Sequence, residues 1–557
     1  MFITGGFMKK LTAALLCGFT CTGVLAARAD GETMESLPVI NRNICISKIE
    51  KPMKAEIQSH YDLHFNGAEN YETGSITVGD KTVAYRFYKE MPFVADPIDV
   101  EYQSMNIYIP EAYFHNEAVG RYTKDSAPIF FPNSIGGYMP AKPGTLEAGR
   151  GNGMSASAYA LVRGYVVAAP GTRGRTNTIS KNGETVYIGK APAGIVDLQA
   201  AVAYLHANDN VMPGNAERII SNGTSAGGAY SLLVGAAGNS KDMTLYLEAL
   251  GAAKARTDIY AVSAFCPITN LEHADMAYEW SYNGVNEYEN HMTGGMLPVA
   301  SAGDLPPAAL GDGTGQNLAA GKASEKKTEK MKLADDQIRY SALLKKEFPA
   351  YVNSLELKDA KGQRLTMNED GTGTFLDYAK SWIIRSAEQA KAGGADISSA
   401  DFLLYGDGYA GKIIGIDWLR YNTAVGRMKT PGAFDGRDNT VGENNEFGTS
   451  VINNMHFTDT AVMYATDGTN LRAHPHIVNM MNPMYYLGKK QVDNAKYWRI
   501  RYGEADNNTS MAIPLMVATK AMNLGYEVDV EFPWNVGHSG DYDLENLFDW
   551  MDSIVNK

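Results

Sequence analysis

The fold of this 557-residue chain is decided by one stretch, Ile219-Ile220-Ser221-Asn222-Gly223-Thr224-Ser225-Ala226-Gly227. It ends in a Gly-x-Ser-x-Gly motif, which follows an apolar run and precedes a helical pattern. The two glycines let the backbone bend sharply, and such a bend exposes the hydroxyl of Ser225 to a neighbouring base. Glycine is so frequent here, at 56 residues, that the motif alone carries little information. Its position between a buried strand and an amphipathic helix therefore carries the prediction of a nucleophilic serine.

Short apolar runs and helical patterns alternate on both sides of this turn. Patterns typical of buried strands occupy residues 129–131, 165–169, 219–220, 260–262, 498–502 and 528–532. A helical face lies among them at residues 195–205, and a last helix closes the chain. This alternation predicts an α/β fold with a mostly parallel sheet, covered by helices on both faces. Two earlier runs, residues 83–88 and 104–109, are expected to add an antiparallel edge.

The strand pattern breaks near Pro267 and resumes only near residue 498. The intervening sequence predicts helices over residues 375–390 and 416–428, and a mobile linker or loop over residues 311–332. Insertions of this kind commonly cover the carboxyl ends of the strands. We therefore predict a large, mainly helical lid, inserted between the strand after the nucleophile helix and the strand that carries the catalytic acid.

The N-terminus has the pattern of an export signal. A pair of lysines precedes an uncharged, mostly apolar run over residues 11–25, and small residues follow it. The alternative, a membrane anchor, is disfavoured because the run is short for a spanning helix. We predict a signal peptide over residues 1–29 and a secreted or periplasmic protein. The α/β domain then comprises residues 30–267 and 471–557, and the lid comprises residues 268–470.

Composition and charge exclude several classes of partner. The net charge of −13, without a basic stripe of interleaved aromatics, argues against nucleic acid. No later segment is long and apolar enough to span a membrane. We expect no cofactor and no metal, and we interpret the acidic loop at residues 435–446 as a solvated loop because it does not follow the EF-hand pattern.

Only two cysteines, Cys45 and Cys266, remain after removal of the predicted signal peptide. An exported protein is able to pair them, but two cysteines alone do not establish a bridge. We interpret Cys266 as a small buried apolar residue, because no histidine pattern lies near it in the sequence.

A serine hydroxyl needs a histidine base, held by a carboxylate, before it attacks a carbonyl. With a nucleophile on this kind of turn, the order along the chain is serine, acid, histidine. His538 follows the last predicted strand and precedes the last helix, so it is the predicted base. Glu504 and Asp506 both follow the preceding strand. We favour Asp506; the alternative is that one of the two only caps the helix that begins near Ser510.

A tetrahedral intermediate also needs backbone N–H donors for its oxyanion. One donor is expected at Ala226, directly after the serine, and the other in the loop of Gly136 and Gly137. The alternative for that glycine pair is an ordinary turn. Asp541 and Asp543, which follow His538, are interpreted as caps at the N-terminus of the last helix.

Three motifs together resemble the bacterial tannases, which are α/β-hydrolase esterases that cleave galloyl esters. They are Pro170-Gly171-Thr172-Arg173-Gly174-Arg175, the Ser221–Gly228 stretch around the serine, and His538-Ser539-Gly540-Asp541-Tyr542-Asp543-Leu544. Fungal tannases and their feruloyl-esterase relatives carry cysteines beside the serine and the histidine, where this chain has Thr224 and Gly537. The resemblance implies an α/β-hydrolase fold, a Ser225, His538 and Asp506 triad and a small phenolic ester as substrate.

The resemblance also implies which residues bind the phenolic hydroxyls. Lys429 and Glu443 in the predicted lid match a lysine and a glutamate of the family, and the third position, an aspartate there, is Asn508 here. An amide accepts a hydrogen bond from a phenol less strongly than a carboxylate and is also able to donate one. Without the resemblance, Lys429 and Glu443 would be interpreted as a solvated ion pair.

Two alternatives to galloyl ester hydrolysis remain from the sequence. One keeps the catalytic residues and changes the substrate to a hydroxycinnamoyl ester or a peptide. The other is a binding protein without catalysis, which we disfavour because both the serine and the histidine are present.

Overall fold

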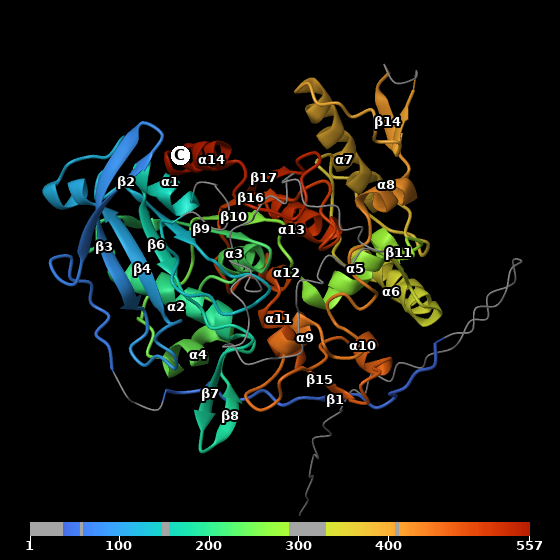
Figure 1. Cartoon of the computed structure of the whole chain (residues 1–557), viewed down its shortest axis with the longest axis horizontal. Coiled ribbons are helices and arrows are strands. Elements are labelled where there is room, and N and C mark those ends of the chain that lie inside the picture. The colour runs from blue at the N-terminus through green and yellow to red at the C-terminus, as the bar shows by residue number, and fades with distance from the viewer. Residues whose placement is uncertain (1–36, 56–59, 148–154, 289–329, 407–410) are drawn as a thin grey trace, which may run out of the picture. The chain divides into compact units, whose positions relative to one another are not determined.

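The centre of the fold is a nine-stranded mixed sheet (Figure 1). We describe it from a computed structural model, which covers residues 37–55, 60–147, 155–288, 330–406 and 411–557. The strands lie in the order β17 (Glu527–Glu531), β16 (Tyr497–Arg501), β10 (Ala261–Phe265), β9 (Asn215–Thr224), β5 (Pro128–Pro132), β6 (Val166–Pro170), β4 (Ser104–Pro110), β3 (Lys81–Pro92) and β2 (Glu72–Val78).

The sheet has a parallel part and an antiparallel part, as the sequence predicts. All pairs from β17 to β6 are parallel, whereas β6, β4, β3 and β2 pair antiparallel. The strands β6, β10 and β16 are buried along their whole length. The strands β6 and β10 consist of apolar and small residues, whereas β16 also carries Arg499 and Arg501, which form ion pairs with Asp543 and Asp529. The strand β2 at the edge alternates between exposed and partly buried residues, because only one of its faces is covered.

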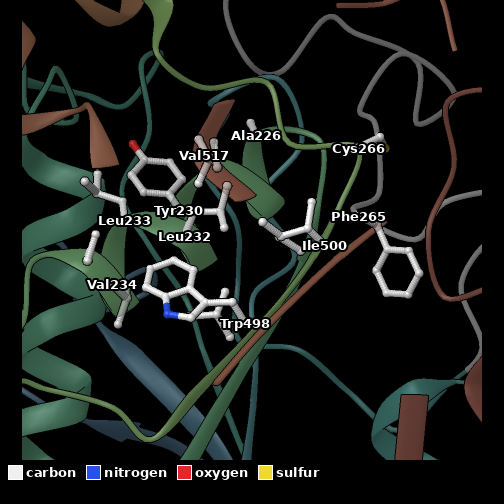
Figure 2. Close-up of a cluster of buried hydrophobic side chains, with 14 of the residues drawn as sticks. Ala226, Tyr230, Leu232, Leu233, Val234, Phe265, Cys266, Trp498, Ile500 and Val517 are labelled. Carbon is white, nitrogen blue, oxygen red and sulfur yellow. The ribbon is translucent and has the colours of Figure 1, made fainter. Parts of the chain in front are cut away.

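Helices pack on both faces of the parallel strands. They are α1 (Ala156–Val162), α2 (Ala193–Ala207), α3 (Ala226–Ala236), α13 (Ala512–Asn523) and α14 (Leu544–Val555). Figure 2 shows side chains of α3 gathered with Trp498 and Ile500 of β16 and Val517 of α13. The helix α3 approaches β10 closely at Gly235, where an added methyl group would lie 2.1 Å from Val262. The turn that carries Ser225 thus lies next to a core of buried apolar side chains.

The segment between β10 and β16 adds no strand to this sheet within the described residues. It contains α5 (Leu271–Tyr282), α6 (Asp335–Ser354), α7 (Thr374–Ala392), α8 (Trp418–Val425), α9 (Gly442–Glu446) and α10 (Asp459–Met463). Four of its described strands form two separate pairs, β11 (Glu287–Tyr288) with β12 (Met331–Lys332) and β13 (Leu403–Tyr405) with β14 (Ile413–Ile416), and a fifth, β15 (Leu471–Arg472), pairs with β1 (Cys45–Ile46). The predicted helix at residues 375–390 is confirmed.

The predicted helix at residues 416–428 is wrong at both of its ends. Residues up to Ile416 belong to β14, where isoleucines suit a strand better than a helix. Asp417 then caps α8 by accepting a hydrogen bond from the Arg420 N–H, and Gly426, with φ of +82°, ends the helix early.

The remaining elements are short: β1 (Cys45–Ile46), η1 (Glu111–His115), β7 (Thr178–Lys181), β8 (Glu184–Tyr187), η2 (Lys241–Met243), α4 (Thr244–Ala249), β15 (Leu471–Arg472), α11 (Pro475–Met480) and α12 (Pro483–Tyr486). The predicted signal peptide, residues 1–29, lies outside the described residues, as does most of the predicted linker at residues 311–332. In the part of the chain that is described, no helix has the length and apolarity needed to cross a membrane. Cys45 and Cys266 are both free thiols.

Candidate active site

Ser225 occupies a strained turn between β9 and α3. Its backbone has φ of +61° and ψ of −122°, a conformation that residues other than glycine rarely adopt. The flanking glycines leave the space that this bend needs. A methyl group at Gly223 would lie 2.4 Å from the Gly227 carbonyl oxygen, and one at Gly227 would lie 2.6 Å from the Asn133 side chain. The turn therefore depends on glycine at both positions.

The register of three parallel strands brings the other site residues to the same edge. Thr224 of β9 pairs with Phe265 of β10, which pairs with Arg501 of β16. The residues that follow these strand ends, Ser225 and Cys266 among them, therefore leave the sheet side by side. The Ser225 N–H donates to the Phe265 carbonyl at 3.0 Å and ties the turn to β10.

His538 and Asp506 meet at this edge through a short hydrogen bond. His538 Nδ1 lies 2.8 Å from Asp506 Oδ2, and the Asp506 side chain is fully buried while 20% of the His538 side chain is exposed. The second carboxylate oxygen of Asp506 accepts the Asn508 N–H at 2.8 Å. The other acid that the sequence left open, Glu504, accepts the Asn535 N–H at 3.2 Å instead, and burial raises its pKa to about 7.

The electrostatics favour the charged form of the histidine. Burial by itself lowers the pKa of His538, but the interactions with Asp506 and, after it, with Cys266 together outweigh burial, and the pKa lies well above its ordinary value. A histidine in this position is therefore prepared to hold the proton that a serine loses on attack.

Two partly buried carboxylates fix the loop that carries His538, and they correct the interpretation of Asp541 and Asp543 as helix caps. Asp543 is the first residue before α14, but its side chain makes no capping hydrogen bond and pairs with Arg499 of β16 instead. Asp541 accepts a hydrogen bond from Asn222 Nδ2 at 3.0 Å, and Asn222 lies on β9 three residues before Ser225. Both carboxylates connect the histidine loop to strands, so the loop is held from two sides.

The glycine loop after β5 lies against the serine turn. The Gly227 position contacts the Ile135 carbonyl oxygen, so the loop and the start of α3 touch directly. Gly137 has φ of +54°, and its carbonyl oxygen accepts a hydrogen bond from Arg175 Nε at 2.8 Å. Ala226 is the first residue of α3, where backbone N–H groups have no partner inside the helix. The structure thus brings Ala226 and the loop of Gly136 and Gly137 together.

The helix α5 holds the segment that contains Lys429. Arg427 forms a fully buried ion pair with Glu279, with 2.9 Å between Nη1 and Oε1. The Tyr278 hydroxyl accepts the Lys429 N–H at 3.1 Å and donates to the Asn507 carbonyl at 3.1 Å. One phenol therefore links the Lys429 segment to the loop between Asp506 and Asn508.

Lys429 is partly buried, and its ammonium group lies against an aromatic ring. Its Nζ lies 4.2 Å from the centre of the Phe434 ring. Burial lowers the pKa of Lys429, and the charges of Glu443, Asp275 and Asp506 oppose this effect. Glu443 and Asp506 are thus near enough to Lys429 to act on its charge, and the partial burial of Lys429 does not fit the alternative of a fully solvated surface pair.

The acidic loop at residues 435–446 is buried at both of its ends, whereas Asp438 and Thr440 in its middle are exposed, so its interpretation as a solvated loop is wrong for the ends only. The Asp435 side chain is fully buried and accepts hydrogen bonds from Asn444 Nδ2 at 2.7 Å and from the Phe457 N–H at 2.9 Å. It also lies 2.7 Å from His456 Nδ1. The Asp435 carboxylate is thus fully occupied by contacts within this segment. These contacts hold the loop in place, and the loop positions α9 and Glu443.

Sequence reasoning missed the position of Cys266. Its Sγ lies 3.9 Å from His538 Nε2, although 272 residues separate the two along the chain. The interpretation of Cys266 as a buried residue is confirmed, and the histidine beside it is near in space but not in the sequence. The sequence contains a signal for this position, because Cys266 directly follows a predicted strand, just as Ser225 directly follows β9.

The sheet and the serine turn at its carboxyl edge define a hydrolase-type fold. A family model described as BD-FAE matches residues 158–301. The structure of Fusobacterium nucleatum tannase is similar with a TM-score of 0.80 and 46% identity, covering 89% of this chain and 100% of that chain. A tannin acyl hydrolase in complex with ethyl gallate and the tannin acyl hydrolase from Lactobacillus plantarum each have a TM-score of 0.77 and 38% identity, covering 88% of this chain and 99% of theirs. No curated protein matches the sequence.

These similarities identify the class and then the family. The protein is a carboxylic ester hydrolase. More narrowly, the chain belongs to the tannase family.

Proposed function

We propose that this chain is an exported serine esterase that hydrolyses galloyl esters through an acyl-enzyme. Ser225 attacks the ester carbonyl, His538 takes the serine proton and passes it to the leaving alcohol, and Asp506 holds the imidazole and stabilises its charged form. Water then releases the phenolic acid by the same steps. The hydrogen bond between His538 and Asp506, at the edge where Ser225 leaves β9, carries this proposal.

The developing oxyanion is assigned to the N–H of Ala226 and to the loop of Gly136 and Gly137. Such donors act best when they are fixed before the reaction begins. Arg175 supports this assignment, because it holds the Gly137 carbonyl oxygen and also reaches the Asn445 side chain on α9 at 3.3 Å. Arg175 is thus a positioning residue between the oxyanion loop and the substrate side of the site.

The phenolic hydroxyls are assigned to Lys429, Glu443 and Asn508. A desolvated ammonium donates strongly to a phenol oxygen, and a carboxylate accepts from a phenol O–H. The similar tannin acyl hydrolase in complex with ethyl gallate supports a galloyl group as the acyl part. Residues 268–470 would act as the lid over residues 30–267 and 471–557, which is supported by the absence of any strand from this segment in the nine-stranded sheet, as far as the described residues extend.

The decisive assay compares methyl gallate with methyl ferulate and a simple acetate ester. We expect the highest kcat/KM for methyl gallate; turnover of another ester without turnover of methyl gallate would overturn the galloyl proposal and favour a hydroxycinnamoyl esterase. A fluorophosphonate probe should label the wild type and the control Ser553→Ala, a substitution on the exposed face of α14, but not Ser225→Ala. Labelling of Ser225→Ala would contradict the role of the serine.

Asn508 offers a separate test of the acyl pocket. We expect Asn508→Asp to lower the KM for methyl gallate by about threefold, because a charged acceptor roughly doubles the strength of a hydrogen bond. The KM for methyl benzoate, which has no phenolic hydroxyl, should not change. An unchanged or higher KM for methyl gallate would count against Asn508 as a pocket residue.

Amino-terminal sequencing of the protein recovered outside the cell tests export and the removal of residues 1–29.

A further inference from the structure

A thiol and an imidazole nitrogen face each other at the base of the candidate active site. Cys266 is 1% exposed, and its Sγ lies 3.9 Å from His538 Nε2 and 3.3 Å from the Ser539 carbonyl oxygen. The ligand atoms of Cys266, Asp506 and His538 all lie within 4.8 Å of one another. The esterase chemistry proposed above gives the thiol no task.

The hydrogen bond to Asp506 leaves one histidine nitrogen for other partners. In neutral His538, Nδ1 carries the proton that Asp506 Oδ2 accepts at 2.8 Å, so Nε2 presents its lone pair on the side of Cys266. Histidines that bind metals in proteins are commonly held in this way, with the other ring nitrogen donating to a carboxylate. Asp506 would thus orient the ligand and need not bind the ion.

The distance between the two atoms suits a tetrahedral metal ion. Zinc lies about 2.3 Å from a thiolate sulfur and about 2.0 Å from an imidazole nitrogen, so two such ligands are about 3.6 Å apart. The observed 3.9 Å differs from this span by a few tenths of an ångström, and the larger Cd²⁺ needs less movement. Because 20% of the His538 side chain is exposed, solvent reaches the site and supplies the remaining ligands.

We propose that Cys266 Sγ and His538 Nε2 form a site for a soft divalent cation, Zn²⁺ or Cd²⁺, that inhibits the enzyme reversibly. Binding forms one metal–sulfur and one metal–nitrogen bond and releases to solvent the thiol proton and, where His538 is charged, also the proton on Nε2. The ion occupies the nitrogen that must accept the proton of Ser225, so ester hydrolysis stops. The inhibition rests on the proposed function, whereas the binding rests on the geometry alone.

Binding is tested on the full protein with Co²⁺, whose bond to a thiolate gives a charge-transfer absorption band in the near ultraviolet. Cys45 provides a matched control, because it is the other free cysteine among the described residues and is exposed. We expect the band at one equivalent in the wild type and in Cys45→Ala, and an affinity at least about tenfold lower in Cys266→Ala. A wild type without the band, or a band that disappears in Cys45→Ala and persists in Cys266→Ala, would overturn the proposal.

Inhibition is tested with methyl gallate, with each variant normalised to its own rate without metal. The Zn²⁺ concentration for half inhibition should be the same in the wild type and Cys45→Ala and at least about tenfold higher in Cys266→Ala, and EDTA should restore the rate. Equal sensitivity of Cys266→Ala would overturn the proposal. Cys266→Ser, which keeps the size of the side chain, replaces the alanine variant if that variant misfolds. If no ester is hydrolysed, the Co²⁺ band still reports on the site, so the two proposals fail separately.

Discussion

The two halves of the candidate site are built in different ways. Ser225, His538 and Asp506 follow the ends of β9, β17 and β16, so the sheet itself brings them together. Lys429 and Glu443 lie on a segment outside the nine-stranded sheet, and buried acids on α5 hold the Lys429 part of it in place. The sheet half depends on strand order, and the other half depends on a few polar contacts. This difference suggests that the first half governs the reaction and the second half governs the choice of acyl group.

The largest effect should come from the sheet half. We expect Asp506→Asn to reduce kcat for methyl gallate by about 10⁴-fold, because the amide no longer stabilises the charged imidazole. Glu504→Gln is the matched control, since Glu504 contacts the Asn535 backbone and should change kcat by less than about tenfold. A larger loss in Glu504→Gln than in Asp506→Asn would reverse the assignment of the acid. Steady-state kinetics of both purified variants measures the difference.

The next effect concerns the support of the other half. Glu279→Ala should lower the free energy of unfolding by about 3–5 kcal/mol, because it leaves the Arg427 guanidinium buried without its partner. The double variant Glu279→Leu with Arg427→Met should recover much of this loss, since apolar residues fill the same space without a charge. Urea denaturation measures both. A single variant as stable as the wild type would show that the ion pair does not hold the segment.

A smaller and more selective effect is expected at Lys429. Lys429→Met should raise the KM for methyl gallate about tenfold through the loss of a charged hydrogen-bond donor, with little change in kcat. The same variant should hydrolyse methyl benzoate as well as the wild type does. Equal losses on both esters would mean that Lys429 serves the structure of the site and does not select the acyl group.

The smallest expected effect is a change in how the free energy of unfolding depends on pH. Burial raises the pKa of Glu446 to about 8, from an ordinary value of 4.5. The folded state therefore holds this proton more tightly than the unfolded chain does, and stability is lost as the pH rises through this window. Glu446→Gln should flatten the loss of stability between pH 4.5 and about 8. The control Glu248→Gln, at an exposed position, should follow the wild type in the same thermal unfolding series.

The sheet half was predictable from the sequence because it depends on local patterns. A residue that directly follows a buried parallel strand must lie at the carboxyl edge, so Ser225, His538 and Asp506 could be placed without knowledge of the fold's details. The lid side could not be placed in this way. Glu279 and Arg427 are 148 residues apart, and Asp435 and His456 meet only because the segment folds back on itself. Cys266 directly follows β10, yet its contact with His538 depends on a loop that Asp541 and Asp543 connect to Asn222 and Arg499, which are distant in the sequence.

The Tyr278 hydroxyl has a practical consequence for protein engineering. It binds the backbone of Lys429 on one side and that of Asn507 on the other, and it sits on α5, ahead of the segment that we propose to select the acyl group. A chimaera that takes this segment from another protein but keeps the native α5 would combine Tyr278 with a backbone segment from a different protein. The sensible crossover point therefore lies before residue 271, so that the transplanted piece brings its own anchoring helix along.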